Sequence, residues 1–209
     1  MVGYSVAMTS LHWDNAYLSK AVEERSWSES GDSDALAELL ASGISKHDAV
    51  IDIGGGSSTF VDSLLRNSFE NISVLDISGA AIGEAQYRTG SLGKNVSWIV
   101  GDVLDWIPPH TYRYWNDRAV FHFLVDPTDQ QNYVNKVREA TSPGSHIVVA
   151  TFSLEGPESC SGLPVQRWSA EQLAVLFAEF CTVVSHTEYE HVTPWGSKQS
   201  FMRLHLMCK

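Results

Sequence analysis

The stretch VIDIGGGSSTF, residues 50–60, constrains the fold most strongly, because three consecutive glycines directly follow a β-branched apolar run. Glycine loses more conformational entropy on folding than any other residue, so three in a row need a structural reason. One reason is a tight turn between a strand and a helix. The other is a ligand that lies so close to the backbone that no side chain fits.

The spacing of apolar residues predicts strands that alternate with helices along most of the chain. Serine and aspartate at positions 78, 126 and 169 stand where helix N-caps belong. This alternation predicts right-handed crossovers and a mainly parallel sheet covered on both faces. We expect strands at 49–53, 72–75, 96–100, 112–115 and 145–152, helices at 34–42, 57–66, 79–88, 126–140 and 173–178, and closing β segments near 181–190 and 199–207.

The position of the glycines favours a ligand. They end the first parallel strand and open a helix, and ligands of such sheets bind at the carboxyl ends of the strands. A P-loop is excluded, because no Gly-Lys-Ser/Thr follows at the required spacing. The dinucleotide fingerprint is matched only loosely, which leaves a nicotinamide-dependent dehydrogenase as a remote alternative.

Acidic residues stand at or beside the ends of three successive predicted strands. Asp52 precedes the glycines, where its carboxylate is suited to an ammonium group. Asp76 lies about 20 residues further on, the place of an acid that accepts ribose hydroxyls. Asp102 ends the third strand and suits an exocyclic adenine amine. One such acid is commonly a helix cap, but three together indicate a nucleoside cofactor.

With these acids, the segments VIDIGGGSS, VLDIS and VGDVLD make the chain similar to class I S-adenosylmethionine-dependent methyltransferases over nearly its whole length. The resemblance implies a Rossmann-like, doubly wound α/β fold with seven mainly parallel strands and an antiparallel last strand. It implies one domain, 1–209, with a helical cap at 1–46 and a core at 47–209. It also implies S-adenosylmethionine as cofactor, S-adenosylhomocysteine as product, and these cofactor-binding residues: Tyr17, Trp27, Asp52, Gly54, Gly55, Gly56, Asp76, Ile77, Asp102, Val103, Trp115 and Asn116.

The flanking segments HWDNAY, RSWS and WNDRAVFHFL resemble a branch that includes thiopurine, tellurite and citrate synthase lysine methyltransferases. In that branch an N-terminal tyrosine and tryptophan close over the methionine end of the cofactor, which assigns this role to Tyr17 and Trp27. The alternative is that both merely pack an N-terminal helix on the sheet.

The segment NDRAVFHF follows the fourth strand, where the resemblance places the methyl acceptor. We expect Asp117, Arg118 and His122 at the start of a helix, with Arg118 and His122 on one face because they are four residues apart. Asp117 is the first candidate for an orienting acid or proton acceptor, and His122 the second. Alternatively, Asp117 pairs with Arg118 and shapes the pocket, and His122 takes no part in chemistry.

The irregular stretch 152–169 is expected to roof the acceptor pocket, with Arg118, Cys160, Arg167 and His191 as substrate contacts. Plain packing of Cys160 stays open, and a nucleophilic role is disfavoured because no His-Asn set accompanies it. We expect an aromatic pocket made by Trp13, Trp27, Trp115, Phe121, Phe123 and Trp168.

Composition limits the partners. The net charge of −11, without a Lys/Arg cluster, disfavours nucleic acid. No apolar run approaches the ~20 residues of a membrane span, and the N-terminus lacks the pattern of a secretory signal. Three cysteines without metal-ligand spacing favour a reducing compartment and no metal. We expect a cytoplasmic monomer or homodimer that binds neither nucleic acid nor membrane.

The small number of candidate bases in the sequence indicates which kind of methyl acceptor to expect. A thiolate needs little base catalysis, whereas an amine must first lose a proton. The few candidate bases and the aromatic pocket favour a small-molecule thiol or related soft nucleophile. A protein-lysine methyltransferase is the alternative, since an acidic surface attracts lysine-bearing proteins, and a non-catalytic S-adenosylmethionine-binding protein is a further one.

Overall fold

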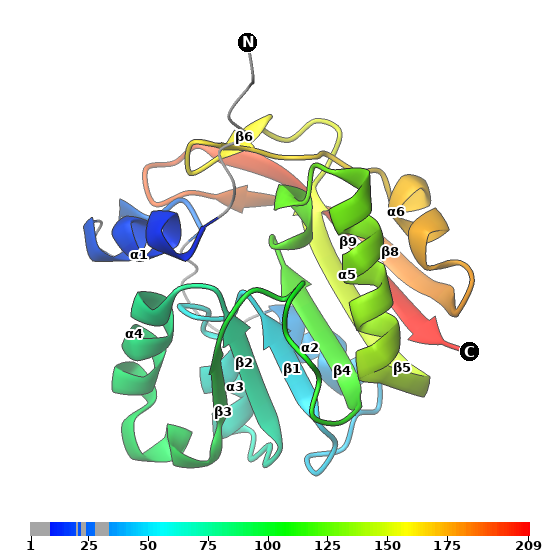
Figure 1. The fold of residues 1–209 in the computed structure, drawn as a ribbon, viewed down its shortest axis with the longest axis horizontal. Helices are drawn as coiled ribbons and strands as arrows, with labels where there is room; N and C mark the ends of the chain where they lie inside the picture. The colour runs from blue at the N-terminus through cyan, green and yellow to red at the C-terminus, as the bar shows by residue number, and fades with distance from the viewer. Residues whose placement is uncertain (1–8, 20, 22–23, 28–33) are drawn as a thin grey trace.

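A seven-stranded sheet in the order β3-β2-β1-β4-β5-β9-β8 forms the centre of the computed structural model, which describes residues 9–19, 21, 24–27 and 34–209 (Figure 1). The first five of these strands run parallel, and β9 runs antiparallel to both β5 and β8. The predicted Rossmann-like α/β fold is therefore confirmed. The strands are β1 (Val50–Ile53), β2 (Ile72–Asp76), β3 (Ser97–Val100), β4 (Tyr112–Arg118), β5 (Thr141–Phe152), β8 (Cys181–Val192) and β9 (Lys198–Cys208).

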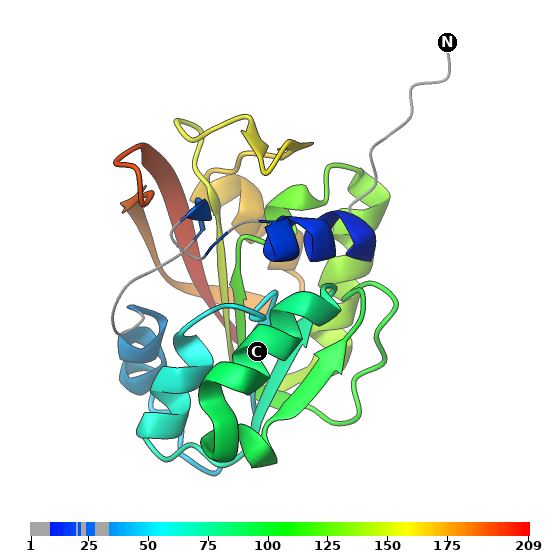
Figure 2. The same ribbon diagram turned by 90° about the vertical axis from the view of Figure 1, so that its left-hand side faces the viewer.

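Helices cover both faces of the sheet (Figures 1 and 2). One face packs against α2 (Asp34–Ala41), α3 (Phe60–Arg66) and α4 (Gly79–Thr89), which a short 3-10 helix (Gly90–Asn95) follows. The other face packs against α5 (Pro127–Ala140) and α6 (Ala170–Phe177). Within the described part of the chain, no helix combines the length and apolarity needed to cross a membrane.

Strand β1 shows why these residues form a central parallel strand. All four of its residues are buried. Val50 packs with the α2–α3 cluster, while Ile51 and Ile53 pack with the α5–α6 cluster. A strand covered on both faces needs apolar residues at successive positions, and in β1 only Asp52 interrupts them.

The predicted helix caps are confirmed. The Ser78 hydroxyl accepts a hydrogen bond from the Ala81 amide at 3.1 Å, and the Asp126 carboxylate accepts one from the Thr128 amide at 2.7 Å. Ser169 forms a capping box with the residue three positions on. Such caps satisfy amides that have no partner within the first turn of a helix.

The end of β4 differs from the sequence-based expectation. The strand continues to Arg118, and only a 3-10 turn, Phe121–Phe123, follows before α5. Asp117 pairs with Ile53 of β1, and Arg118 pairs with Ala150 of β5. Because strands on both sides hold this backbone extended, Asp117 and Arg118 end a strand rather than start a helix, and the proposed shared helix face with His122 is wrong.

Two segments lie above the carboxyl ends of β1, β2 and β4 (Figures 1 and 2). One is α1 (Ser10–Ser19), and the other is the small hairpin of β6 (Ser159–Cys160) and β7 (Leu163–Pro164). Helix α1 is fixed to α4 through Asp14, whose Oδ1 accepts hydrogen bonds from the Ser78 hydroxyl at 2.7 Å and the Ala80 amide at 3.0 Å. The sheet edge where a ligand was expected is thus covered by these two segments.

Candidate active site

A cavity of about 900 Å³, counting open solvent at its mouth, lies at this edge of the sheet. Its walls come from strand ends, the β6–β7 hairpin, the β8–β9 hairpin, and the N-terminal segment, which consists of α1 and residues 24–27. The lining residues are Trp13, Tyr17, Ser26, Trp27, Ile53, Gly54, Ser57, Ser58, Leu75, Asp76, Ile77, Gly101, Asp102, Val103, Arg118, Ala119, Val120, His122, Phe123, Phe152, Cys160, His191, Gln199 and Phe201.

The three glycines make a turn that side chains would disrupt. Gly54 lines the cavity with φ +67°, and a Cβ there would stand 2.2 Å from the Val120 side chain. A Cβ on Gly55 would stand 2.2 Å from a carboxylate oxygen of Asp52. A Cβ on Gly56 would stand 2.4 Å from Cβ of Ala81. Gly55 and Gly56 do not line the cavity, so the protein's own packing already requires them, while Gly54 stands at the wall.

Asp76 joins the glycine turn to the start of α4. Its Oδ2 accepts a hydrogen bond from the Gly56 amide at 3.0 Å, and its Oδ1 accepts one from the Ser78 amide at 2.8 Å. Burial raises the pKa of Asp76 to about 6, although these two amides act in the opposite direction. Asp76 is among the residues that line the cavity, where its predicted contact with the ribose requires it.

Asp52 lies directly beneath the glycines. Its Oδ1 accepts a hydrogen bond from the Asn116 amide at 2.6 Å, whereas its buried Oδ2 has no hydrogen-bond partner within the described part of the chain. Burial raises the pKa of Asp52 to about 7. Neither side chain forms the cavity wall, so the structure places both just behind the glycine turn, and their contact with a cofactor stays a prediction. An unpaired carboxylate oxygen is suited to a cationic group.

Asp102 occupies the cavity wall after β3. Its Oδ1 accepts a hydrogen bond from the Leu104 amide at 2.9 Å, a turn contact that leaves Oδ2 for another donor. Ile77 and Val103 line the same cavity and supply apolar walls beside the two acids. The structure thus brings the predicted adenosine-binding residues together from β2 and β3.

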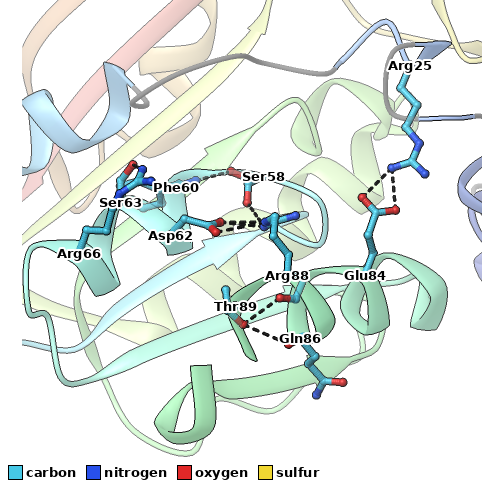
Figure 3. Close-up of polar contacts among 11 residues, drawn as sticks. Arg25, Ser58, Phe60, Asp62, Ser63, Arg66, Glu84, Gln86, Arg88 and Thr89 are labelled. Atoms are coloured by element: carbon cyan, nitrogen blue, oxygen red, sulfur yellow. Dashed lines mark hydrogen bonds and ion pairs between the residues drawn. The ribbon is translucent and has the colours of Figure 1, made fainter. Parts of the chain in front are cut away.

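The N-terminal segment is bound to α4 by Arg25, which is only 4% exposed (Figure 3). Its Nη1 donates to both carboxylate oxygens of Glu84, at 2.9 and 2.8 Å, and its Nη2 donates to the Tyr17 carbonyl at 3.0 Å. The rings of Tyr17 and Trp27 lie 5.6 Å apart and both line the cavity. The two alternatives for Tyr17 and Trp27 therefore do not exclude each other, because the same contacts that pack the N-terminal segment also place both rings in the cavity wall.

A second ion pair supports the loop that follows the glycines (Figure 3). Arg88 of α4 binds Asp62 of α3 at 2.9 Å and donates to the Ser58 carbonyl at 2.8 Å. Because Ser58 lines the cavity, this contact fixes one wall to two helices.

Asp117, the first candidate for catalysis, faces the core. Its Oδ2 accepts hydrogen bonds from the Tyr133 hydroxyl at 2.5 Å and the Phe121 amide at 3.2 Å, and its Oδ1 accepts one from the Val120 amide at 2.8 Å. The carboxyl group is fully buried, which raises its pKa to about 7. Both oxygens are engaged and Asp117 does not line the cavity. Its assignment as a proton acceptor is corrected to a structural role.

Three aromatic residues expected in the pocket also lie in the core. Trp115 donates from Nε1 to the Tyr133 hydroxyl at 3.0 Å, so the structure does not support its assignment as a cofactor contact. The rings of Phe121 and Trp168 lie 5.5 Å apart, tilted by 43°, in the same α5–α6 cluster. Alternate strand residues point to opposite faces, and Trp115 and Asp117 share the face that α5 covers. The cavity instead receives Trp13, Trp27 and Phe123, with Phe152 and Phe201 unforeseen.

His122 is fully buried and lines the cavity. The Phe152 amide donates a hydrogen bond to its Nδ1 at 3.4 Å. Burial lowers the pKa of His122 to about 3, so the ring is neutral near pH 7. With Nδ1 occupied, the ring is unsuited to the proton acceptor role that the sequence suggested.

The expected substrate contacts divide in two. Arg118, Cys160 and His191 line the cavity. Arg118 donates to the Trp27 carbonyl at 3.2 Å, and His191 contacts the Ser26 carbonyl at 2.6 Å, so both also hold the N-terminal segment. Arg167 is absent from the wall, because it bonds to the Gly156 carbonyl and to a glutamate of the roof loop.

Two aromatic residues of the cavity wall, Phe152 and Phe201, were not among the aromatic residues predicted for the pocket. Phe152 ends β5 and pairs with Phe201 of β9, which brings both to the cavity. The predicted strand 145–152 already ended at Phe152, so its place at the carboxyl end of a strand was the available signal, whereas Phe201 lies near the start of β9. Asp14 and Arg25 left no comparable signal, because their partners on α4 are distant in sequence.

Residues 44–204 match the family model described as methyltransferase domain, so the chain belongs to this family. Its fold is that of the class I methyltransferases, whose cofactor is S-adenosylmethionine. The glycine turn and the acids at the cavity edge fit this group.

The chain is 26% identical over 187 residues to EEF1A lysine methyltransferase 2 of Danio rerio, with 81% of this chain and 73% of that protein covered. A structure from work on the conversion of a disulfide bond into a thioacetal group during echinomycin biosynthesis has a TM-score of 0.76 and 21% identity, over 97% of this chain and 93% of that one. The N-methyltransferase NodS of Bradyrhizobium japonicum WM9, in complex with S-adenosylhomocysteine, has a TM-score of 0.66 and 18% identity, over 93% and 99% of the two chains.

Proposed function

We propose that this protein transfers the methyl group of S-adenosylmethionine to a small-molecule acceptor, a thiol or related soft nucleophile. The observation that carries the proposal is the chemistry of the cavity wall. Asp76 and Asp102 are the acids among the described lining residues, and both stand at the adenosine end. Near β4 and β5 the wall is aromatic, neutral or cationic, so an ammonium group finds no carboxylate there to bind or deprotonate it.

When bound, S-adenosylmethionine supplies a methyl group already activated by a sulfonium, which leaves an in-line displacement. Asp76 and Asp102 would orient the adenosine, with Asp52 behind the glycines facing the ammonium group. Tyr17 and Trp27 would cover the methionine end and exclude water. Alignment of this kind contributes up to ~7–11 kcal/mol in favourable cases, which suits a site without a positioned base.

The second candidate is a protein-lysine methyltransferase, favoured by the Danio rerio relative and by the acidic net charge of −11. Aromatic residues such as Trp13 and Phe123 would also contact a lysine side chain by cation–π interaction. A non-catalytic S-adenosylmethionine-binding protein is the third.

The test is incubation with methyl-labelled S-adenosylmethionine and three separate acceptor pools: small thiols, small amines and cell proteins. Phenylmethanethiol and benzylamine form a matched pair in the first two pools, since they differ only in the acceptor atom and the amine is an ammonium ion at neutral pH. We expect labelled thioether from phenylmethanethiol and no labelled product from benzylamine. An Asp76→Ala variant serves as the control for cofactor-dependent transfer. Efficient labelling of a protein lysine, with no turnover of any small thiol, would establish the second candidate instead.

A further inference from the structure

The hydrogen bond between Phe152 and His122 determines which ring nitrogen carries the proton. A neutral imidazole has one N–H donor and one acceptor nitrogen. The Phe152 amide can only donate, and it points at Nδ1 across 3.4 Å. The proton of the neutral ring therefore stands on Nε2.

The Nε2–H group has no protein acceptor in the part of the chain that the structure describes. His122 is 0% exposed, and Nε2 has no hydrogen-bond partner among the described residues. The ring cannot turn easily to find one, because Phe123 packs edge-on against it at 4.4 Å and Phe152 packs against it at 4.7 Å. A buried donor without an acceptor is unfavourable, so a residue held this way in a cavity wall is a candidate to bind a ligand.

The surrounding charge indicates what kind of ligand atom Nε2–H would meet. His122 follows β4, while of the two acids in the wall Asp76 ends β2 and Asp102 follows β3. In this sheet β1 lies between β2 and β4, so β2 and β4 are two strand spacings, about 10 Å, apart. Arg118, at the end of β4, adds a positive charge to the His122 side. This side of the cavity favours an electron-rich or anionic atom over an ammonium group.

We propose that His122 is a specificity-determining residue that donates a hydrogen bond from Nε2–H to the thiolate of the acceptor substrate. The inference rests on the proposed function and adds that the acceptor binds as the ionised thiolate. The thiolate sulfur provides the electron pair of the new sulfur–carbon bond, and the methyl–sulfonium bond breaks with its pair left on the cofactor sulfur. No proton moves, so a donor at this position stabilises the thiolate and a base is not required.

The protonation of His122 is tested directly in the cofactor-free protein by ¹⁵N NMR of the imidazole rings. We expect His122 to show the Nε2–H tautomer and no protonation between pH 5 and 8. A ring that carries its proton on Nδ1, or that becomes doubly protonated in this range, would overturn the inference whatever the acceptor proves to be.

The contact with substrate is tested by binding of benzenethiol in the presence of S-adenosylhomocysteine, which prevents turnover. His122→Asn keeps an oxygen for the Phe152 amide but lacks a donor at the position of Nε2, whereas His122→Gln brings a side-chain amide there. We expect His122→Asn to weaken benzenethiol binding by about 10- to 100-fold, and His122→Gln to recover most of it, with S-adenosylhomocysteine affinity unchanged in both.

Equal affinity of the wild type and His122→Asn, or equal loss in the two variants, would contradict the donor role. If the wild type binds S-adenosylhomocysteine but not benzenethiol, the thiol acceptor of the proposed function fails, and a thiolate contact fails with it. The NMR result then distinguishes a failure of the proposed thiol acceptor from a wrong tautomer of His122, because it reports the tautomer without any acceptor present.

Discussion

The backbone amide of Gly56 donates a hydrogen bond to the carboxylate of Asp76 across 3.0 Å, although 20 residues separate them. The contact joins the glycine turn after β1 to the end of β2, at the edge of the cavity. A Cβ on Gly56 would stand 2.7 Å from the same carboxylate. The residue type at 56 and the position of the carboxylate are therefore mutually dependent.

Gly56→Ala should weaken cofactor binding and destabilise the fold, because its Cβ would also stand 2.4 Å from Cβ of Ala81. We expect a loss of ~1–3 kcal/mol of stability, as for other overpacked sites, measured by chemical denaturation. Gly83→Ala is the matched control. It lies in α4, where the added Cβ would meet no described atom within 4 Å apart from its chain neighbours and its own helix backbone, and it should stabilise the protein by ~0.5–1 kcal/mol. Equal stability of the two variants would contradict this account of the turn.

Asp76→Ala should weaken S-adenosylmethionine binding by about 10- to 100-fold, since hydrogen bonds to a charged group contribute ~1.5–3 kcal/mol. Titration calorimetry on the folded variant measures the dissociation constant, and circular dichroism checks the fold. An unchanged dissociation constant in a folded variant would leave Asp76 only the role of anchoring the amides of Gly56 and Ser78.

Asp52 should make cofactor affinity depend on pH. Its pKa, about 7 in the cofactor-free protein, lies above the usual value because of burial, so the carboxyl is mostly protonated at pH 6 and mostly ionised at pH 8. The ammonium group favours the ionised form, and the dissociation constant should rise about 10-fold as the pH falls from 8 to 6. Calorimetry across this range measures it. In Asp52→Asn the affinity should be lower at pH 8 and should change only about 2-fold over this range, which is the part that Asp76, with a pKa of about 6, contributes. A slope as steep as that of the wild type would exclude Asp52 as its source.

Asp117→Ala should affect stability more than methyl transfer. The substitution leaves the Tyr133 hydroxyl and the amides of Val120 and Phe121 without their acceptor. Since a buried unpaired donor costs ~1–3 kcal/mol, we expect a loss of ~3 kcal/mol or more in the free energy of unfolding. Asp105→Ala, at an exposed position, should change it by less than ~0.5 kcal/mol. Undiminished stability of Asp117→Ala, with turnover abolished under folding conditions, would restore the catalytic assignment.

The Arg25–Glu84 ion pair should hold the N-terminal segment over the cavity. Arg25→Ala and Glu84→Ala should each raise the dissociation constant of S-adenosylmethionine and expose the segment to limited proteolysis. Glu84 is partly exposed, so we expect an effect of only ~1–2 kcal/mol. The double variant should be no weaker than the more affected single one. Full additivity of the two losses would show that the residues act independently.

The sequence by itself determined the fold class, the glycine turn and the helix caps. Each depends on residues close together in the chain: apolar periodicity sets the strands and helices, and Ser78, Asp126 and Ser169 bond to amides two or three positions away. The acids at the strand ends were also predictable, because parallel strands bring their carboxyl ends to one edge.

Only the tertiary structure decided what the candidate residues at the end of β4 face. Pairing with β1 and β5 keeps Asp117 extended and on the side of α5, where Tyr133, 16 residues further on, engages it. His122 is neutral because it is buried, and its tautomer depends on the amide of Phe152, 30 residues away. The local sequence pattern identifies a titratable side chain as a candidate, but its burial and its distant partners determine its charge and the face to which it points. The division between a structural aspartate and a cavity-lining histidine is therefore a property of the folded chain.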